Sequence, residues 1–510
     1  MMSSIEKAKH FFDLGLHFLE QGDPGLAEEN FNQALILAPD RPSILINLSA
    51  TLVQLGKWNE CEKICRKILG IDEINYDGLI NLGVCLSHLE RTSEALKLLD
   101  KAIEVDPLSE KAWINKGNIL QESNQPNAAA TCFNKALHLN PRAEEALIGR
   151  GNTHNELNKY EAALNDFDTA LEINPTNPQA KWNKSLSLLR LGKFDEGWRL
   201  YEARWQIPGM REYQRHFNIP LWLGEESLKD KTILIHAEQG YGDTIQFSRY
   251  IPLIESMGAK VVFLAPNPLS KLMETLSPTV HVIEDDNFEF KTILKKVDFH
   301  CPIMSLALAF NTTLETIPIE TPYLLADQYT RDSWLSVLEK LSSENQDAPK
   351  PYRVGIAWNG SGHYAGTKNS KRDIPASQIA GLINYFQGEN IEFHSLQIER
   401  GKNYEIYPLI KGKFFTHHEK LDNFNHTAAL MSHMNLIISV DTSVAHLAGA
   451  LKLPTLILLP NPPDFMSLIN CEVSPWYTST SFLRQAKRGD WAGPLNTAKN
   501  KIAQSYFDAK

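Results

Sequence analysis

The sequence predicts an α + α/β protein in which an N-terminal all-α repeat solenoid is followed by two Rossmann-like α/β lobes. A 34-residue period runs through the first 210 residues, and from residue 232 short apolar runs alternate with helical patterns. The segment LSSENQDAPKP at 341–351 has linker composition and divides that alternation in two. We therefore expect a solenoid over 1–210, a first lobe over 211–345 and a second lobe over 346–510.

The repeat is marked by prolines at 39, 107, 141 and 175, with Glu73 at the intervening position, and the same spacing puts a sixth mark at residue 209. Small residues let two antiparallel helices approach closely, larger residues fill the next layer, and we expect each proline to open the following helix. The small residues stand 24 places before each mark and the larger ones 8 places before it. The small column is Gly15, Ser49, Gly83, Gly117, Gly151 and Ser185, and the larger column is Phe31, Cys65, Leu99, Phe133, Phe167 and Tyr201.

This pattern resembles the tetratricopeptide repeat. The resemblance implies about six repeats over residues 8–209 and a concave groove that commonly holds an extended peptide or a partner helix. Asparagines 26 places before the marks would line this groove as a ladder whose amides bind a polypeptide backbone, as in protein O-GlcNAc transferases. The alternative is that asparagine is simply common at this repeat position. The ladder residues are Asn47, Asn81, Asn115 and Asn183.

Composition restricts the partners and the compartment. Lys plus Arg number 51 against 61 for Asp plus Glu, so the net charge of −10 disfavours nucleic acid. No run of about 18 apolar residues predicts a membrane span, and the amino terminus does not resemble a secretory signal. The six cysteines form no CxxC pair, which suits free thiols in a reducing cytoplasm. We expect a cytoplasmic protein whose partners are proteins or small molecules.

The second half of the chain reads as parallel βαβ units. The apolar runs are separated by stretches long enough for helices, as parallel strands require. Ligands of such sheets bind at the carboxyl ends of the strands, so substrates should lie in the cleft between the lobes. The expected strands are 232–237, 260–266, 280–285 and 298–304 in the first lobe, and 352–360, 391–397, 413–418, 435–441 and 454–460 in the second.

The segment AEQGYGDTIQFSRY is the first chemical signal, since a strand ends there in a glycine-containing turn and a helix opens. Gly240 and Gly242 allow a tight turn, and Asp243 near the helix start should be exposed in the cleft. An ordinary helix N-cap is the commoner role for such an aspartate. Neither GxGxxG nor GK[ST] is present, so the turn predicts no dinucleotide cofactor and no P-loop.

The segment SVDTSVAHLAGALKLP is the second signal. After a predicted strand, Thr442 and Ser443 open a helix whose free N–H groups can hold a diphosphate, and Asp441 can bind a sugar or ribose hydroxyl. His446 is either a phosphate or sugar contact or a neutral packed histidine. The whole pattern could also be helix-sheet packing.

Together, GYGD and SVDTSVAHLAGAL resemble the heptosyltransferase group of inverting GT-B glycosyltransferases. DFHCPIMSLALAF, VGIAWNG, FHSLQ, SPWY and FLRQ extend the likeness to bacterial repeat-containing proteins of this type. The resemblance implies a GT-B-type pair of lobes, the first for the acceptor and the second for a nucleotide-sugar donor. It also implies that Asp243 is the general base and that Asp441, Thr442 and His446 lie at the donor site.

The resemblance implies no metal and no cofactor beyond the nucleotide-sugar co-substrate, because a helix dipole and a cation stabilise the leaving diphosphate. Lys371 or Arg372 is the candidate cation, and a surface charge run is the alternative. Asn359 and Gln397 end predicted strands and either contact the donor or are turn residues. Glu238 is the rival base, or else a structural partner of the Asp243 turn. Histidines 417, 418, 426, 433 and 446 match no zinc spacing.

The chain departs from these relatives at NPPDFMSLI, where they carry an Asp-Trp-Arg-Trp stretch and only Asp464 remains of the polar set. Three functions stay open. The first is an inverting glycosyltransferase acting on a protein acceptor that the repeat groove presents. The second is a transferase for a lipid-linked or envelope glycan, and the third is a scaffold that has lost catalysis.

Overall fold

The computed structural model describes residues 3–284, 290–342, 349–360 and 371–508. The chain forms two compact units, Met1–Asn183 and Lys184–Lys510. The first is entirely helical in its described residues, and the second contains two parallel sheets. The α + α/β class predicted from the sequence is confirmed.

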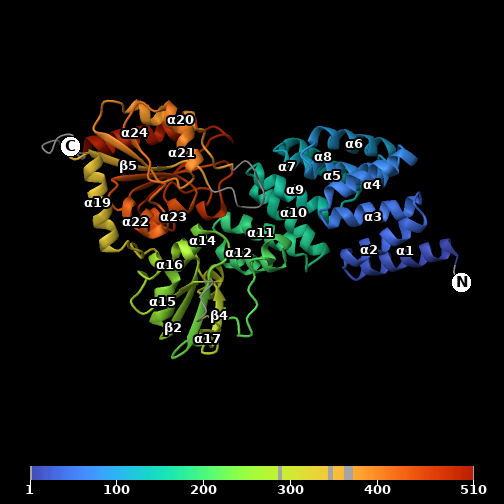
Figure 1. Cartoon of the computed structure of the whole chain (residues 1–510), viewed down its shortest axis with the longest axis horizontal. Coiled ribbons are helices and arrows are strands. Elements are labelled where there is room, and N and C mark those ends of the chain that lie inside the picture. The colour runs from blue at the N-terminus through green and yellow to red at the C-terminus, as the bar shows by residue number, and fades with distance from the viewer. Residues whose placement is uncertain (1–2, 285–289, 343–348, 361–370, 509–510) are drawn as a thin grey trace. The chain divides into compact units, whose positions relative to one another are not determined.

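Successive helices of the first unit pack against one another in pairs (Figure 1). The helices are α1 Ser4–Glu20, α2 Pro24–Leu37, α3 Pro42–Gln54, α4 Trp58–Ile71, α5 Tyr76–His88, α6 Thr92–Val105, α7 Glu110–Glu122, α8 Pro126–Leu139, α9 Glu144–Glu156 and α10 Tyr160–Ile173, and α11 Pro178–Arg190 crosses the unit boundary.

The small and large columns of the repeat meet as predicted. A Cβ atom added to Gly15 would lie 2.5 Å from the Phe31 ring, and one added to Gly151 would lie 2.5 Å from the Phe167 ring. Phe31 and Phe167 are completely buried. These two repeats therefore close by packing a ring of the second helix onto the backbone of the first.

The expectation that the repeat prolines open helices is wrong. Pro39 directly follows Ala38, the C-cap of α2, and the next helix begins three residues later at Pro42. The prolines at 107, 141 and 175 occupy the same position after α6, α8 and α10. A proline disfavours the helical conformation of the residue before it, and Ala38 has φ −144° and ψ 74°. These prolines terminate helices.

The second unit begins within the sixth predicted repeat, 27 residues before the boundary at 210 expected from the sequence. Its first elements are α12 Phe194–Tyr201, η1 Glu202–Gln206 and α13 Pro208–Arg211. The Trp198 ring packs edge-on against Phe247 at 5.7 Å, and the Phe194 ring stacks on Trp476 at 5.9 Å. These aromatic contacts attach the last repeat helix to the α/β unit.

The first sheet has the order β3-β2-β1-β4 with every described pairing parallel. Its strands are β1 Thr232–His236, β2 Lys260–Ala265, β3 His281–Glu284 and β4 Phe299–Pro302. The helical elements around it are α14 Tyr241–Phe247, η2 Ser248–Tyr250, α15 Ile251–Ser256, α16 Asn267–Met273, α17 Phe290–Leu294, η3 Ile303–Ser305 and α18 Leu306–Ala309. The next helix, α19 Gln328–Ser342, packs instead against α22 Phe424–Met431 of the second sheet region.

The second sheet has the order β10-β9-β8-β5-β6-β7, also parallel. Its strands are β5 Tyr352–Ala357, β6 Ile391–Ser395, β7 Phe414–Phe415, β8 Leu436–Val440, β9 Thr455–Leu459 and β10 Thr480–Arg484. Its helical elements are α20 Ala376–Tyr385, α21 Arg400–Ile406, η4 Tyr407–Leu409, α22 Phe424–Met431, α23 Ser443–Ala450, η5 Phe465–Ser467 and α24 Ala492–Asp508.

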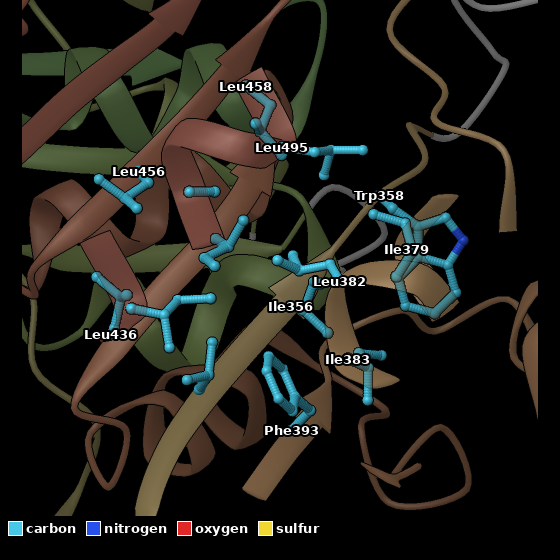
Figure 2. Close-up of a cluster of buried hydrophobic side chains, with 14 of the residues drawn as sticks. Ile356, Trp358, Ile379, Leu382, Ile383, Phe393, Leu436, Leu456, Leu458 and Leu495 are labelled. Atoms are coloured by element: carbon cyan, nitrogen blue, oxygen red, sulfur yellow. The ribbon is translucent and has the colours of Figure 1, made fainter. Parts of the chain in front are cut away.

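The core of the second sheet explains its near-continuous apolar strands. Ile356, Phe393 and Leu458 project from three strands toward Ile383 of α20 and Leu495 of α24 (Figure 2). Strands covered on both faces carry unbroken apolar runs, as parallel sheets do. All nine strands expected from the sequence are present, and β10, which lies in the FLRQ segment, is an additional edge strand that the sequence analysis missed.

Candidate active site

Asp243 lies in the first turn of α14, immediately after β1. The backbone N–H of Gly240 donates to its Oδ2 at 3.0 Å, so the carboxyl caps its own helix. The side chain is partly buried rather than exposed as the sequence suggested. Gln239, before this turn, has φ 57°, a left-handed conformation that is uncommon for a residue other than glycine.

Asp441, Thr442 and Ser443 form the junction between β8 and α23. Asp441 is 6% exposed at the carboxyl end of β8, and Ser443 is the first residue of the helix. Thr442 is the N-cap residue, but its hydroxyl lies 3.2 Å from Ser439 Oγ and makes no capping bond. The first backbone N–H groups of α23 are therefore not capped by the Thr442 side chain.

The two sequence signals, which lie about 200 residues apart, meet in space. A Cβ atom added to Gly242 would lie 2.9 Å from His446 Cδ2 and 3.5 Å from Ser443 Cα. Because no larger residue fits there, the start of α14 lies directly against the start of α23. This contact brings the candidate base and the candidate donor residues into one site.

His446 lies close to Gly242 of the GYGD segment and to Asp441 of its own segment. Its Nε2 is 3.8 Å from Asp441 Oδ1, and its Nδ1 is 3.3 Å from the Tyr477 hydroxyl. Burial, with Arg249 and Arg372 nearby, lowers the pKa of His446 to about 3. The ring is consequently neutral at pH 7 and can exchange hydrogen bonds, but it supplies no positive charge.

Carboxyl groups dominate the electrostatics of this site. Burial is the main cause that raises the pKa of Asp243 to about 7, and the charges of Asp464 and Glu238 add to it while Arg372 opposes it. Burial also raises the pKa of Asp441 to about 6, with Arg372 opposing and Asp464 adding. Both carboxyls can therefore exchange protons near neutral pH.

Arg372 supplies a cation at this cluster. Its Nη1 donates to the backbone carbonyl of Asp441 at 2.7 Å. Lys371 is exposed, whereas Arg372 is half-buried and contacts Asp441. Most of the glycine-bearing loop before them, residues 361–370, lies outside the described residues.

Gln397 joins the ends of β5 and β6. Its Oε1 accepts from the N–H groups of Trp358 and Asn359 at 2.9 and 3.0 Å, and its Nε2 donates to Glu399. This geometry supports the alternative of a turn residue for Gln397. Asn359 is 8% exposed, and within the part of the chain that the structure describes its buried Oδ1 has no hydrogen-bond partner.

Glu238, the rival base, is held in a buried ion pair. Arg204 Nε and Nη2 donate to its two carboxylate oxygens at 2.9 Å each, and the Met304 N–H donates to Oε1 at 3.1 Å. Glu238 is 3% exposed and Arg204 is fully buried. The geometry supports the structural-partner interpretation of Glu238.

The sequence analysis missed Arg249 and Tyr477, both of which support the site. Arg249 Nη1 donates to the Trp476 carbonyl at 2.7 Å, and its guanidinium lies 4.6 Å from the Tyr477 ring centre. A Cβ atom on Gly449 would lie 2.3 Å from that ring. Arg249 lies in AEQGYGDTIQFSRY and Tyr477 in SPWY, two segments that the sequence analysis singled out. A single sequence does not show that their side chains meet.

Asp464 keeps a structural role in the divergent segment NPPDFMSLI. Its Oδ1 accepts from Met466 N–H at 3.4 Å at the start of η5. The next ring, Phe465, lies 5.9 Å from Tyr201, and Gln246 Nε2 donates to Met466 Sδ at 3.4 Å. The divergent segment thus packs onto α12 and α14, which explains its apolar residues.

The asparagine column is engaged within the solenoid. Asn47 and Asn115 each donate to the carbonyl four residues earlier, and Asn183 accepts from Gln179 Nε2. Asn81 donates to Ser49 Oγ of the preceding repeat at 2.9 Å and is 9% exposed. These contacts support the interpretation of a packing position for Asn81.

The structure also bears on the cysteines, on possible metal ligands and on membrane spans. All six cysteines are free, as predicted. Across the described residues, no three His, Cys, Asp or Glu side chains are grouped as metal ligands. Among these same residues, no helix combines the length and apolar character that crossing a bilayer requires.

Comparison with known families finds matches in each half of the chain. Models of the tetratricopeptide repeat match residues 18–79, 76–107, 110–142 and 144–177. The model of glycosyltransferase family 9 (heptosyltransferase) matches residues 410–474. The chain joins tetratricopeptide repeats to a glycosyltransferase family 9 domain. The matched part of that domain contains Asp441, Thr442, Ser443, His446 and Asp464, whereas Asp243 lies outside it.

Among known proteins, the chain is similar to Protein FlbA of Caulobacter vibrioides, with 25% identity over 342 residues that cover 62% of this chain and 54% of FlbA. It thus spans about half the length of that relative. Among solved structures, it is similar to TTC0263, a thermophilic tetratricopeptide-repeat protein of Thermus thermophilus, and to PilF of Pseudomonas aeruginosa. TTC0263 has 21% identity and a TM-score of 0.34, covering 36% of this chain and 99% of TTC0263. PilF has 23% identity and a TM-score of 0.33, covering 41% of this chain and 96% of PilF.

Proposed function

We propose that the protein is an inverting, metal-independent glycosyltransferase of GT-B type that moves a sugar from a nucleotide-sugar to an acceptor. The family 9 match supports glycosyl transfer in general. The contact of Gly242 with Ser443 and His446 carries the finer proposal, because it brings a candidate base and an open helix start to one place.

In the proposed reaction, the ionised carboxylate of Asp243 takes the proton of the acceptor hydroxyl while that oxygen attacks the anomeric carbon. The bond between that carbon and the diphosphate breaks, and the diphosphate leaves with the bonding electrons. A base with a pKa of about 7 suits this step, since it is available at neutral pH and still basic enough to accept a proton.

The donor is proposed to lie against α23. The first N–H groups of this helix and the Arg372 guanidinium favour a diphosphate, while Asp441 and the Asn359 Oδ1 offer acceptors to sugar or ribose hydroxyls. Neutral His446 can donate one hydrogen bond to a phosphate oxygen. No metal and no further cofactor enters this proposal.

The repeats indicate protein–protein interaction, so we propose a protein acceptor presented by the solenoid, in the cytoplasm to which the free thiols are suited. At Asn47 and Asn115 a side-chain N–H is already engaged within the helix, so their side-chain carbonyl oxygens are the groups offered to such a partner. A lipid-linked glycan acceptor or a scaffold without catalysis are the alternatives.

A thermal-shift screen with nucleoside diphosphates and nucleotide-sugars tests the donor proposal. A ligand at 100 times its dissociation constant stabilises the folded state by about 2.7 kcal/mol. Arg372→Met should abolish the shift produced by the best ligand, and Lys371→Met is the matched control. No shift from any nucleotide, or an equal loss in both variants, would contradict the proposed donor site.

A further inference from the structure

The turn that carries Asp243 is held in place by residues that precede the first lobe in the sequence. Two side chains just before Gly240 are clamped by the end of the last repeat helix and the 3-10 turn that follows it. The Gln239 Nε2 donates to the Tyr201 hydroxyl at 3.1 Å, and Glu238 receives both arms of Arg204. The left-handed backbone of Gln239 needs such support, because it is unfavourable for this residue type.

Arg204 itself has no freedom in this arrangement. Its Nη2 also donates to Ser305 Oγ at 2.8 Å, and its Nη1 donates to Glu202 Oε1 at 2.6 Å. The Tyr201 and Trp205 rings flank the guanidinium at 4.8 and 4.2 Å. A planar guanidinium saturated in this way holds a carboxylate in one orientation, which a lysine could not reproduce.

We propose that Arg204 is a positioning residue for catalysis: through Glu238 it fixes the turn that presents Asp243, and it neutralises the charge of Glu238. The inference rests on the proposed function, since it takes Asp243 as the base. It assigns to the 3-10 turn after the last repeat helix a part in the chemistry of the α/β unit.

The proposal can be tested through the protonation of Asp243, which responds to the charged groups around it. Glu238 lies on its own turn, Asp464 on the segment after β9, Arg372 before α20, and Asp441 and His446 at the start of α23. Of these, only Glu238 is paired with Arg204. Removing Arg204 leaves an extra negative charge near Asp243, whereas removing the Glu238 charge leaves an extra positive one, so the two changes must act in opposite directions.

The test is a ¹³C NMR titration of the full chain labelled at the aspartate side-chain carboxyls, in which the signal missing from Asp243→Asn identifies Asp243. We expect the titration midpoint of Asp243 to rise in Arg204→Met and to fall in Glu238→Gln, each by at least about half a pH unit. Arg199→Met, which removes an exposed cation from the preceding helix α12, is the control and should leave the midpoint unchanged.

The double variant Arg204→Met/Glu238→Gln keeps the test decisive if Arg204→Met does not fold. Its pair is neutral, so its midpoint should return toward the parental value and lie above that of Glu238→Gln. Equal midpoints in these two variants, or shifts of the same sign in the two single variants, would overturn the proposal. The titration needs no turnover, so its failure is distinct from a failure of the proposed activity, which Asp243→Asn tests.

Discussion

Asp243 combines a structural and a proposed chemical role in one carboxyl group. Its Oδ2 accepts from the Gly240 N–H, and burial beside Asp464 and Glu238 raises its pKa to about 7. An asparagine has the same size and can still accept the Gly240 hydrogen bond, but it cannot take a proton. The two roles can therefore be separated by one substitution.

We expect Asp243→Asn to lower sugar transfer by about 10²- to 10⁴-fold, the usual contribution of a general base. Its melting temperature should stay close to the parental value, because the helix cap is kept. Its nucleotide affinity should not fall, because Asn cannot become negative and repel the diphosphate. Transfer is measured with the nucleotide-sugar selected by thermal shift, and Glu238→Gln is compared in the same assay. Transfer at the parental rate in the Asn variant would leave Asp243 as a helix cap alone.

Two raised carboxyl pKa values predict opposite effects of pH on binding and on turnover. Asp243 and Asp441 lose their protons near pH 7 and pH 6, so both become negative as the pH rises. Turnover should rise through about pH 7, because only ionised Asp243 accepts a proton. Donor affinity should fall over pH 5.5 to 8, because ionised carboxyls repel the diphosphate, whose own charge in a nucleotide-sugar is constant in this range.

Calorimetry across that pH range measures the affinity, and initial rates at saturating donor measure the turnover. In Asp441→Asn the fall in affinity should be shallower, since one of the two titrating carboxyls is gone. An affinity that is constant or increases with pH in the parental protein would show that these carboxyls do not face the donor.

At the scale of elements, α23 is shaped by the ring of Tyr477. The small residues of SVAHLAGAL were open to a packing explanation, and at Gly449 that explanation is right, because a Cβ atom would lie 2.3 Å from Tyr477. The same ring touches His446 and Arg249. Close packing of α23 thus holds the candidate donor residues in place.

Gly449→Ala should destabilise the protein by about 1–3 kcal/mol, the usual cost of an overpacked core position. Gly381→Ala on α20 is a matched control, because no atom lies within 4 Å of its added Cβ and alanine favours the helix by about 0.5–1 kcal/mol. Chemical denaturation of both variants measures the difference. Equal stabilities would mean that Tyr477 moves away without cost.

The solenoid and the parallel strands could be predicted from the sequence because their signals are local. The repeat columns pair Gly15 with Phe31 within one helix pair, and apolar runs define strands such as β8. GYGD and SVDTSVAH each follow a predicted strand. Because ligands bind at the carboxyl ends of parallel strands, both segments were expected at the cleft between the lobes. These inferences need only short-range patterns and one topological rule.

What the sequence could not show depends on contacts between distant residues. Arg204 and Glu238 are 34 positions apart, and Arg249 and Trp476 are 227 apart, so a single sequence carries no sign of their pairing. The repeat prolines were misassigned for a different reason, since a proline fits both a helix start and the position after a helix end. The burial of Asp243 likewise depends on the packing of α14 against α23.

At the scale of the whole molecule, the last repeat belongs to the α/β unit. Trp198 and Arg204 are at most 2% exposed, and they contact Phe247 and Glu238 of the first sheet region. Phe194, which is 3% exposed, stacks on Trp476 of the second sheet region. The sequence boundary at 210 would cut these contacts. A truncation at that boundary therefore exposes aromatic surface and leaves Glu238 as a buried charge without its cation.

We expect a fragment of residues 178–510 to be soluble and to unfold cooperatively, since it keeps α11, α12 and η1. A fragment of residues 215–510 should aggregate or be less stable, because breaking a buried ion pair alone costs about 3–5 kcal/mol. Residues 1–177 should fold separately, as repeats stabilise one another through neighbour contacts. Size-exclusion chromatography and thermal unfolding compare the three fragments with the full chain. If 215–510 matches 178–510 in solubility and melting temperature, the last repeat helix is dispensable for the α/β unit, and its buried contacts contribute little to the fold.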